Sequence, residues 1–276
     1  MSSEWYAGLA GGFFRSARRH ADRPALVVDG TSESYGALAQ RALRIAGALG
    51  SGGHEDGVVA ILAARSSTAY AAILGALAAG RGYAPLNPKF PPARSLHMLE
   101  ASGARAVVVG PEALGLLPAL LEGVSRPLVV LGPAVGSFGA LLASHGRHVF
   151  LDAAAIASAP LGAPTSVSDD DVAYLLFTSG STGTPKGVPI RHRNVVPYVA
   201  HMVDRYGWSP DDRFSQMFDL TFDLSVHDLF VTWSAGGSLH VVPEAATMAP
   251  AKFIRDHALT AWFSVPSVVA FAARMR

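Results

Sequence analysis

Short apolar runs, many of them rich in β-branched residues, recur along the chain and predict buried strands. The runs are continuous rather than alternating, which is typical of sheets that are covered on both faces. Alanine- and leucine-rich segments of helical length lie between many of them. The predicted strands cover residues 25–28, 58–62, 106–109, 128–131, 172–177, 238–242 and 261–265, and the predicted helices include residues 35–49, 67–79, 91–102 and 194–206.

The order of these segments predicts the fold class. Strands alternate with helices over most of the chain, which favours an α/β architecture with mainly parallel sheets. Residues 152–171 contain alanine, proline and serine and end in three aspartates, so they indicate a surface connection and a candidate subdomain boundary. The segment FSVPSVVAFAARMR, residues 263–276, predicts a strand followed by the start of a helix.

Composition narrows the class of protein. The chain has 276 residues, of which 50% are hydrophobic and only 16% charged, a composition that favours a folded chain with a sizeable core over intrinsic disorder. A formal net charge of +1 is too small for the molecule as a whole to attract nucleic acid or an acidic membrane surface. The absence of cysteine excludes disulfides, thiolate metal sites and a cysteine nucleophile, and it favours a reducing, cytoplasmic location. The longest apolar stretch, residues 68–80, is too short for a membrane span, and the N-terminus lacks the pattern of a signal peptide.

The segment with the clearest chemistry is YLLFTSGSTGTPKG, residues 174–187, where an apolar run gives way to small and hydroxylated residues. This pattern predicts a strand that leads into a phosphate-binding loop. Glycines allow backbone N–H groups to approach a ligand, the hydroxyls add neutral donors, and Lys186 adds a positive charge. A plain turn would need neither the hydroxyls nor the lysine. A Walker-type loop is disfavoured because Pro185 precedes Lys186 and Gly187 follows it.

This segment resembles the T-S-G-S-T-G-x-P-K-G signature of adenylate-forming, AMP-binding enzymes, and it agrees at every specified position. The family includes acyl-CoA ligases, luciferases and the adenylation domains of non-ribosomal peptide synthetases. The segments LAAGRGYAPLNPKFPPAR, residues 77–94, and SYGALAQRALRIAGAL, residues 34–49, resemble an earlier family motif and the family's opening helix. The resemblance runs from about Pro24 to the end of the chain.

The resemblance implies a reaction and a set of phosphate-binding residues. In this family a carboxylate attacks the α-phosphate of ATP, giving an acyl-adenylate and pyrophosphate, and a thiol then accepts the acyl group. The resemblance implies ATP with Mg²⁺ as cofactors, and it makes Lys186 and Thr178 the expected catalytic residues. The expected phosphate-binding residues are Thr178, Ser179, Gly180, Ser181, Thr182, Gly183, Thr184, Lys186 and Gly187.

A second segment, FDLTFDLSVHDLF at residues 218–230, resembles the F-D-x-S pattern of amino-acid-activating adenylation domains. The resemblance assigns Asp223 to the substrate's α-ammonium group, and it places Leu224, His227 and Ser264 in the side-chain pocket. A carboxylate in a partly apolar pocket needs a cation to offset its desolvation. Two alternatives remain open: Asp223 as an N-terminal helix residue favoured by the helix dipole or paired with His227 at i,i+4, and His227 as an ordinary histidine.

Other polar residues carry weaker signals. Arg191, His192 and Arg193 lie beside the loop, but a solvated helix start explains them better than a phosphate site. His145 and His148 lack the spacing and partners of metal ligands. We therefore expect no metal site built from protein side chains, and Mg²⁺ would enter with ATP.

The family resemblance also defines the expected architecture. It implies two largely parallel sheets with packed helices, forming an incomplete N-terminal large domain over residues 1–276 without a C-terminal subdomain. One sheet is expected at roughly 68–190, and the second at roughly 1–67 plus 191–276. Family members run to about twice this length, and the chain lacks the later motifs that bear the ribose-binding aspartate and the second lysine.

The expected function is activation of an amino acid as its aminoacyl-adenylate, for transfer to a carrier-protein phosphopantetheine thiol. The expected partners are the amino acid, the carrier protein and a C-terminal half that another chain could supply, with neither nucleic acid nor membrane. The chain alone is expected to be inactive. The alternatives are a fragment of an acyl- or aryl-CoA ligase, and a non-catalytic nucleotide-binding fragment.

Overall fold

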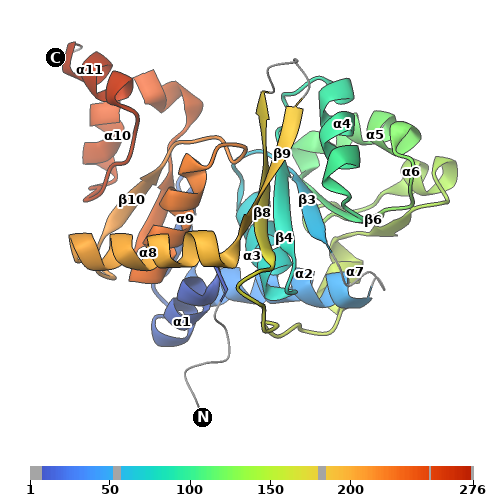
Figure 1. Cartoon of the computed structure of the whole chain (residues 1–276), viewed down its shortest axis with the longest axis horizontal. Helices are drawn as coiled ribbons and strands as arrows, with labels where there is room; N and C mark the ends of the chain where they lie inside the picture. Colours follow the sequence, from blue (N-terminus) through green and yellow to red (C-terminus); the bar gives the residue numbers. More distant parts are fainter. Residues whose placement is uncertain (1–7, 52–56, 180–184, 249, 275–276) are drawn as a thin grey trace. The chain divides into compact units, whose positions relative to one another are not determined.

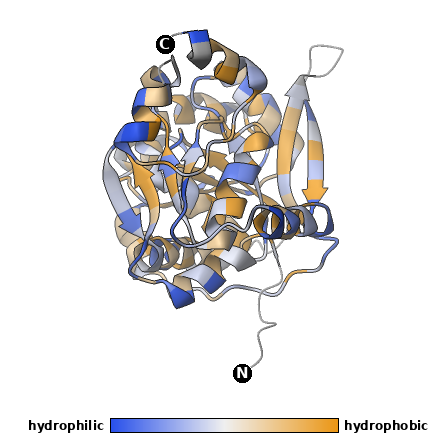
Figure 2. Ribbon diagram, turned by 90° about the vertical axis from the view of Figure 1, so that its left-hand side faces the viewer, coloured by the Kyte–Doolittle hydropathy of each residue, from blue (hydrophilic) through white to orange (hydrophobic). Residues whose placement is uncertain are grey.

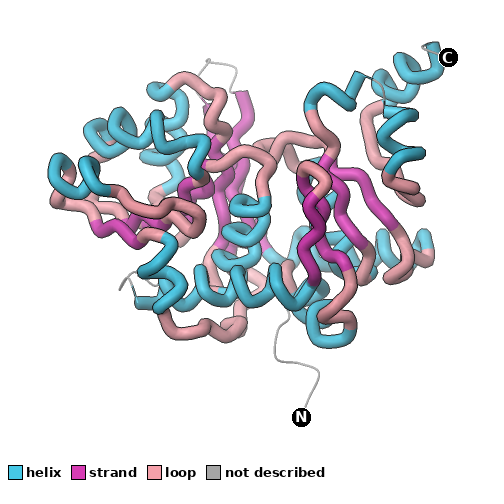
Figure 3. The backbone as a smooth tube through the Cα atoms, turned by 180° about the vertical axis from the view of Figure 1, so that it is seen from behind, coloured by secondary structure: helices cyan, strands magenta, loops and turns pink. Residues whose placement is uncertain are grey.

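The computed structural model describes residues 8–51, 57–179, 185–248 and 250–274. These residues contain eleven strands, which form two separate sheets. The chain divides into two compact units. The first comprises Met1–Ala10 and Ala39–Val196, and the second comprises Gly11–Leu38 and Pro197–Arg276. Figure 3 shows that helices border both groups of strands. The predicted α/β fold with two largely parallel sheets is confirmed.

The first unit contains a seven-stranded sheet in the order β7-β6-β5-β3-β4-β8-β9 (Figure 1). All neighbouring pairs are parallel except β8 and β9, which form an antiparallel pair at one edge. In chain order, the strands are β3 (Val58–Leu62), β4 (Gly82–Leu86), β5 (Ala106–Val109), β6 (Val129–Leu131), β7 (Val149–Leu151), β8 (Val172–Ser179) and β9 (Pro185–Arg191).

Helices of this unit pack against the sheet. Helix α3 is buried over almost its whole length, because its residues are nearly all apolar and small. It begins after Ser66, whose hydroxyl accepts a hydrogen bond from the Ala69 N–H. The helices are α2 (Tyr35–Ser51), α3 (Ser67–Ala78), α4 (Pro92–Ser102), η1 (Pro111–Leu116), α5 (Leu117–Gly123), α6 (Gly139–Ser144), α7 (Ala153–Ser158) and α8 (His192–Tyr206); α2 and α8 each continue across a boundary between the units.

The second unit contains a four-stranded sheet in the order β10-β11-β1-β2. Strand β11 is parallel to both β10 and β1, whereas β1 and β2 form an antiparallel hairpin. The remaining elements of this unit are α1 (Gly11–Arg19), β1 (Pro24–Val28), β2 (Thr31–Ser34), β10 (Arg213–Gln216), α9 (Leu224–Ala235), β11 (Ser238–Val241), η2 (Glu244–Met248), α10 (Pro250–Asp256) and α11 (Pro266–Arg274).

Each unit has its own core. In the first, strand residues such as Leu62 and Val109 pack with Leu99 and Leu121 from the flanking helices. In the second, Phe13, Tyr35 and Trp233 pack ring against ring, with Phe13 lying 5.4 Å from Trp233 between ring centroids. Figure 2 shows the strongest hydrophobic colouring on the strands and inner helices, with hydrophilic residues mainly on peripheral helices and connections.

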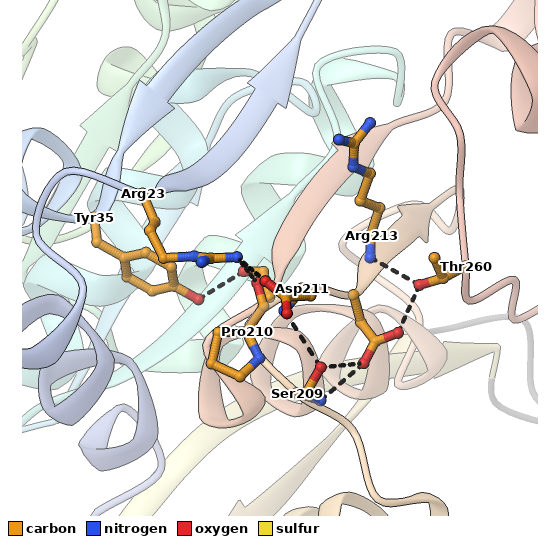
Figure 4. A network of polar contacts seen from close by, with 9 residues as sticks. Arg23, Tyr35, Ser209, Pro210, Asp211, Arg213 and Thr260 are labelled. Atoms are coloured by element: carbon orange, nitrogen blue, oxygen red, sulfur yellow. Dashed lines mark hydrogen bonds and ion pairs between the residues drawn. The ribbon is translucent and has the colours of Figure 1, made fainter.

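Polar contacts connect the beginning of the second unit to its later part (Figure 4). Arg23 donates to the Pro210 carbonyl and to the Asp211 carboxylate, each at 2.6 Å, and the Tyr35 hydroxyl donates to the Gly237 carbonyl at 2.7 Å. Burial alone would raise the pKa of Asp212, but hydrogen bonds from Ser209 and Thr260 outweigh it, so the pKa of this carboxyl is lowered.

The division of the chain differs from the expected one at its N-terminal side. We expected residues 1–67 in the second sheet, but β3 lies in the seven-stranded sheet and the units separate inside α2, between Leu38 and Ala39. The candidate boundary at residues 152–171 is also wrong, because β7 and β8 on either side of it belong to one sheet. The hydropathy pattern could not show to which sheet β3, β7 or β8 belongs, because a buried parallel strand has the same pattern in either sheet.

Candidate functional site

The predicted phosphate-binding segment forms a β-hairpin at the edge of the seven-stranded sheet. Strand β8 is buried from Ala173 to Phe177 and becomes exposed at Thr178, and β9 begins at Pro185. The connecting residues Gly180, Ser181, Thr182, Gly183 and Thr184 lie outside the described residues, and Ser179 is described only in its backbone.

Thr178 and Lys186 are direct partners across this hairpin. Opposite residues of an antiparallel pair project from the same face, with Cβ atoms about 5 Å apart, so a hydroxyl and an ammonium group share one exposed face. Gly187 pairs with Phe177, and a Cβ at Gly187 would lie only 3.1 Å from Leu175 Cδ1 and 3.3 Å from Phe177 Cε1. The pair of donors fits phosphate oxygens, which bind both neutral hydroxyls and positive charge.

A histidine that the sequence did not single out fixes the start of β9. His97, on α4, lies with Nε2 3.1 Å from the Pro185 carbonyl oxygen. A carbonyl can only accept a hydrogen bond, so Nε2 of His97 is the donor. His97 therefore anchors the backbone immediately before Lys186. No local sequence pattern predicts this contact, because it joins residues that are 88 positions apart.

The basic cluster after β9 has structural partners. Arg191 and Arg193 both bind Asp170, through its carbonyl and its carboxylate respectively. His192 is buried, and its Nδ1 accepts a hydrogen bond from the Leu9 N–H at 3.1 Å. Burial lowers the pKa of His192, partly offset by the nearby Asp171 and Asp169. These contacts agree with the interpretation of the cluster as a helix start rather than a phosphate site.

The F-D-x-S segment forms the turn that begins α9 in the second unit. The Ser225 hydroxyl donates to the Phe222 carbonyl at 2.6 Å, and Asp219 Oδ1 accepts from the Thr221 N–H at 2.9 Å. These contacts fix the backbone around Asp223. Asp223 is exposed and occupies the N-cap position in a helical conformation, but its side chain makes no capping hydrogen bond. Asp223 thus lies at the N-terminus of α9, as the helix-dipole alternative expects, but without a capping hydrogen bond.

His227 lies one turn along α9, and its partner is a tyrosine rather than Asp223. Its Nδ1 lies 2.7 Å from the hydroxyl of Tyr198 on α8, and its ring packs on Phe263 with centroids 4.1 Å apart. Burial lowers the pKa of His227 to about 4, so the imidazole is neutral near pH 7. Leu224 and Ser264, the other predicted pocket residues, are partly buried.

A cavity of about 370 Å³ lies beside His227, within the second unit. Its wall includes His227 but none of Asp223, Leu224 and Ser264. Aromatic residues dominate it, and the polar part includes Ser215, Asp228 and Thr260. The aromatic residues are Tyr206, Trp208, Phe214, Trp262 and Phe263. Tyr198 was not predicted, because it meets His227 only through the packing of α8 against α9.

The predicted residues thus fall into two groups, each in its own unit. Thr178, Lys186 and Gly187 belong to the first unit, and Asp223, Leu224, His227 and Ser264 to the second. His148 has a structural role, since its Nδ1 accepts from the Leu128 N–H at 3.1 Å. Within the described residues, no group of three or more His, Asp or Glu side chains is arranged to hold a metal ion. None of the helices in the described part of the chain has the length and apolar character that a bilayer crossing requires.

Comparisons with known proteins agree with these features. The family model described as "AMP-binding enzyme" matches residues 13–275. Surfactin synthase subunit 1 of Bacillus subtilis is 32% identical over 234 residues, covering 84% of this chain and 6% of the synthase. The L-proline--[L-prolyl-carrier protein] ligase of Pseudomonas fluorescens is 32% identical over 259 residues, covering 92% of this chain and 49% of the ligase.

A solved structure has the same fold. The Vibrio cholerae adenylation domain AlmE, in complex with glycyl-adenosine-5'-phosphate, superposes with a TM-score of 0.86 at 30% identity. The match covers 100% of this chain and 52% of the AlmE chain. The chain thus spans about half the length of AlmE and of the prolyl-carrier ligase, and a small part of the synthase.

Proposed function

The chain belongs to the AMP-binding enzyme family, and on that basis we propose that it forms the ATP- and amino-acid-binding part of an amino-acid adenylation domain. The proposed reaction activates an amino acid as its aminoacyl-adenylate. The proposed acceptor is the phosphopantetheine thiol of a carrier protein. Support for this acceptor comes from relatives such as the prolyl-carrier ligase.

The phosphate side of the reaction rests on the hairpin. The substrate carboxylate would attack the α-phosphorus of ATP, and the bond from that phosphorus to the bridging oxygen would break, releasing pyrophosphate. We propose that Lys186 and Thr178 bind the β- and γ-phosphate oxygens and stabilise charge on the leaving group. Residues 179–184 and Gly187 would contribute backbone N–H and hydroxyl donors. Mg²⁺ bound to ATP would share the negative charge and needs few protein ligands.

The observation that carries the amino-acid assignment is the position of Asp223. Its backbone is fixed by the Ser225 turn, and its carboxylate makes no hydrogen bond or ion pair within the described residues. An exposed carboxylate on a fixed backbone, with no protein partner, is available to accept charge-assisted hydrogen bonds from an ammonium group. A plain fatty or aromatic acid has no such group, which disfavours the acyl- or aryl-CoA ligase alternative.

The experiment compares an amino acid with its deaminated analogue in ATP–pyrophosphate exchange. The enzyme is this chain extended by the second half of a homologous adenylation domain. Asp223→Ala should lower kcat/KM for the amino acid about 10- to 150-fold, equivalent to about 1.5–3 kcal/mol for one charge-assisted contact, and change it little for the analogue. Asp204→Asn removes an exposed carboxylate of α8 and serves as the control. A wild-type preference for the deaminated acid, or an unchanged preference in Asp223→Ala, would refute the assignment.

A further inference from the structure

Strand β9 is the outer strand of the seven-stranded sheet, and its two prolines show which of its backbone groups face outward. Among the described strands, its only neighbour is β8. In an antiparallel strand the N–H and C=O of one residue point to the same side, and successive residues alternate. Proline has no N–H, so it fits an outer strand where that group would face away from the partner strand. Pro185 and Pro189 are four positions apart and therefore both face away from β8.

The first two residues of β9 are therefore held from opposite sides. Lys186 directs its backbone N–H and C=O towards its partner Thr178, whereas the Pro185 carbonyl points to the free edge. A carbonyl at a free edge has no partner in the sheet. His97 supplies one, with Nε2 3.1 Å from the Pro185 oxygen. The neutral Nε2–H tautomer and the imidazolium both donate from this atom, so the contact does not depend on the charge of the ring.

Helix α4 gives His97 a fixed base. The helix lies beside β9 (Figure 1). The next two residues, Met98 and Leu99, are each 1% exposed and belong to the core of the first unit. One position further, the Glu100 carboxylate accepts a hydrogen bond from the Ser125 N–H at 2.6 Å. The donor is thus carried by a helix that is tied to the core, whereas β9 itself is largely exposed.

The contact acts on the backbone immediately before Lys186. A shift of the Pro185 peptide shifts the Cα atom of Lys186, because the two residues are adjacent. When a group must meet reacting atoms, a misplacement of about 1 Å can cost about 100-fold in rate. His97 restrains the start of β9 from the side that pairing with β8 leaves open.

We propose that His97 is a positioning residue for Lys186: through the Pro185 carbonyl it fixes the start of β9, so that the Lys186 ammonium group meets the phosphates as pyrophosphate leaves. The effect on the reaction rests on the proposed function. The anchoring of β9 by His97 does not.

The first test measures amide hydrogen exchange of the ¹⁵N-labelled 276-residue chain by NMR. The Lys186 amide is the probe, because Pro185 has no N–H. His97→Phe keeps a flat ring without a donor and should speed exchange at Lys186 about 2- to 10-fold, the range of one neutral hydrogen bond; His97→Gln restores a donor and should keep the wild-type rate. His145→Phe is the matched control, because His145 precedes β7 at the opposite edge of the sheet and its Nδ1 contacts the Ser144 hydroxyl. An unchanged rate in His97→Phe, or an equal increase in His145→Phe, would overturn the anchoring.

The second test uses ATP–pyrophosphate exchange by the extended enzyme. We expect His97→Phe to lower kcat about 3- to 10-fold and to leave KM for the amino acid unchanged, and His97→Gln to restore kcat. In a Lys186→Ala background, His97→Phe should lower kcat by less than about 1.5-fold, because the group that His97 positions is gone.

The double variant separates positioning from a general structural role. Independent losses that multiply in the double variant would overturn the positioning of Lys186 by His97. No exchange by the extended enzyme, or no loss in Lys186→Ala alone, would overturn the effect on the reaction and count against the proposed function. Hydrogen exchange at Lys186 would still decide the anchoring of β9.

Discussion

Lys186 lies on a strand rather than in the connecting loop. Its backbone is paired with Thr178 of β8, and the residue before it is anchored by His97. The position of its ammonium group is therefore limited mainly by side-chain rotamers. Such placement suits a group that must meet negative charge developing on a leaving pyrophosphate.

We predict that Lys186→Ala slows ATP–pyrophosphate exchange by the extended enzyme at limiting ATP. Loss of one charge-assisted contact should cost about 1.5–3 kcal/mol, or roughly 10- to 150-fold in rate. Lys252→Ala is the control, because that lysine is exposed and paired with Asp256 one turn along α10. Equal rates for wild type and Lys186→Ala would refute the assignment of Lys186 to the phosphates of ATP.

Individual site residues differ in how far the sequence reveals them. Lys186 and Asp223 stand within linear motifs, so their positions could be predicted without a structure. Tyr198 and His97 could not, because they reach their partners across 29 and 88 residues of sequence. A contact of this kind depends on the packing of whole helices, and no local pattern encodes it.

Helices α2 and α3 approach closely at Gly75. A Cβ at this position would lie 2.8 Å from Ile45 Cγ2 and 2.9 Å from the Ala42 carbonyl oxygen. The carbonyl belongs to the backbone of α2 and cannot move without shifting that helix. Glycine is therefore required here by contact, although it weakens a helix.

We predict that Gly75→Ala lowers the free energy of unfolding by about 1–2 kcal/mol, because overpacking exceeds the gain of about 1 kcal/mol in helix propensity. Gly50→Ala is the matched control, since Gly50 also lies in a helix, α2, but has open space around its Cβ position. It should leave stability unchanged or raise it by up to about 1 kcal/mol. Urea unfolding of both variants measures the difference, and a Gly75→Ala chain as stable as Gly50→Ala would contradict the packing argument.

Strand β11 buries a histidine that should make the chain sensitive to acid. Burial, followed by the nearby His257 and Arg213, lowers the pKa of His240 to about 4. The unfolded chain binds this proton below about pH 6.5, whereas the folded chain does not until about pH 4. Stability is therefore full above pH 6.5 and falls as the pH drops towards 4.

We predict that His240 alone accounts for about 2 kcal/mol of lost stability between pH 6.5 and pH 5. His240→Gln should show a correspondingly shallower pH dependence of urea unfolding than the wild type. His201→Gln replaces an exposed histidine of α8 and should keep the wild-type dependence. Identical pH profiles for His240→Gln and wild type would show that His240 is not the acid-sensitive group.

Apolar runs predicted most strands that lie inside a sheet, and they missed most of the edge strands. Six of the seven predicted strands correspond to β1, β3, β5, β6, β8 and β11. Strand β9 contains Pro185 and Pro189 and is largely exposed, so it lacks a strand pattern, but an edge position tolerates proline. The strand predicted at residues 261–265 is wrong: of these residues, only Ala261 forms a bridge, to Phe214, and α11 begins at Pro266. Proline is well suited to the first position of a helix.

The α/β class and the two sheets followed from the order of elements and the family resemblance, but the division between the units did not. It falls inside α2, where no loop or change of composition marks it, and inside α8 directly before Pro197, a proline that does not end the helix. Helical periodicity continues through both positions. Only the contacts of each half helix distinguish the two units.

We predict that the 276-residue chain alone gives no amino-acid-dependent ATP–pyrophosphate exchange above background. The family resemblance places a ribose-binding aspartate and a second lysine in motifs that this sequence does not contain. Without them the carboxylate and the α-phosphate would not be held in line, and most of the positional advantage would be lost. The assay compares the chain alone with the chain mixed with the separately expressed second half of a homologous adenylation domain. Robust exchange by the isolated chain would disprove the prediction, and exchange only after mixing would show that the added half supplies the groups the reaction needs.

The sheet order also sets a sequence of events during synthesis on the ribosome. Every strand of the seven-stranded sheet has emerged once Arg191 has left the exit tunnel. By contrast, β1 pairs with β11, and the Trp233 indole donates to the Ala25 carbonyl across 208 residues. Residues 11–38 are therefore synthesised early, but Phe13 and Tyr35 stay exposed until α9 and β11 have been synthesised. During this interval the nascent chain exposes an apolar segment that a chaperone would bind.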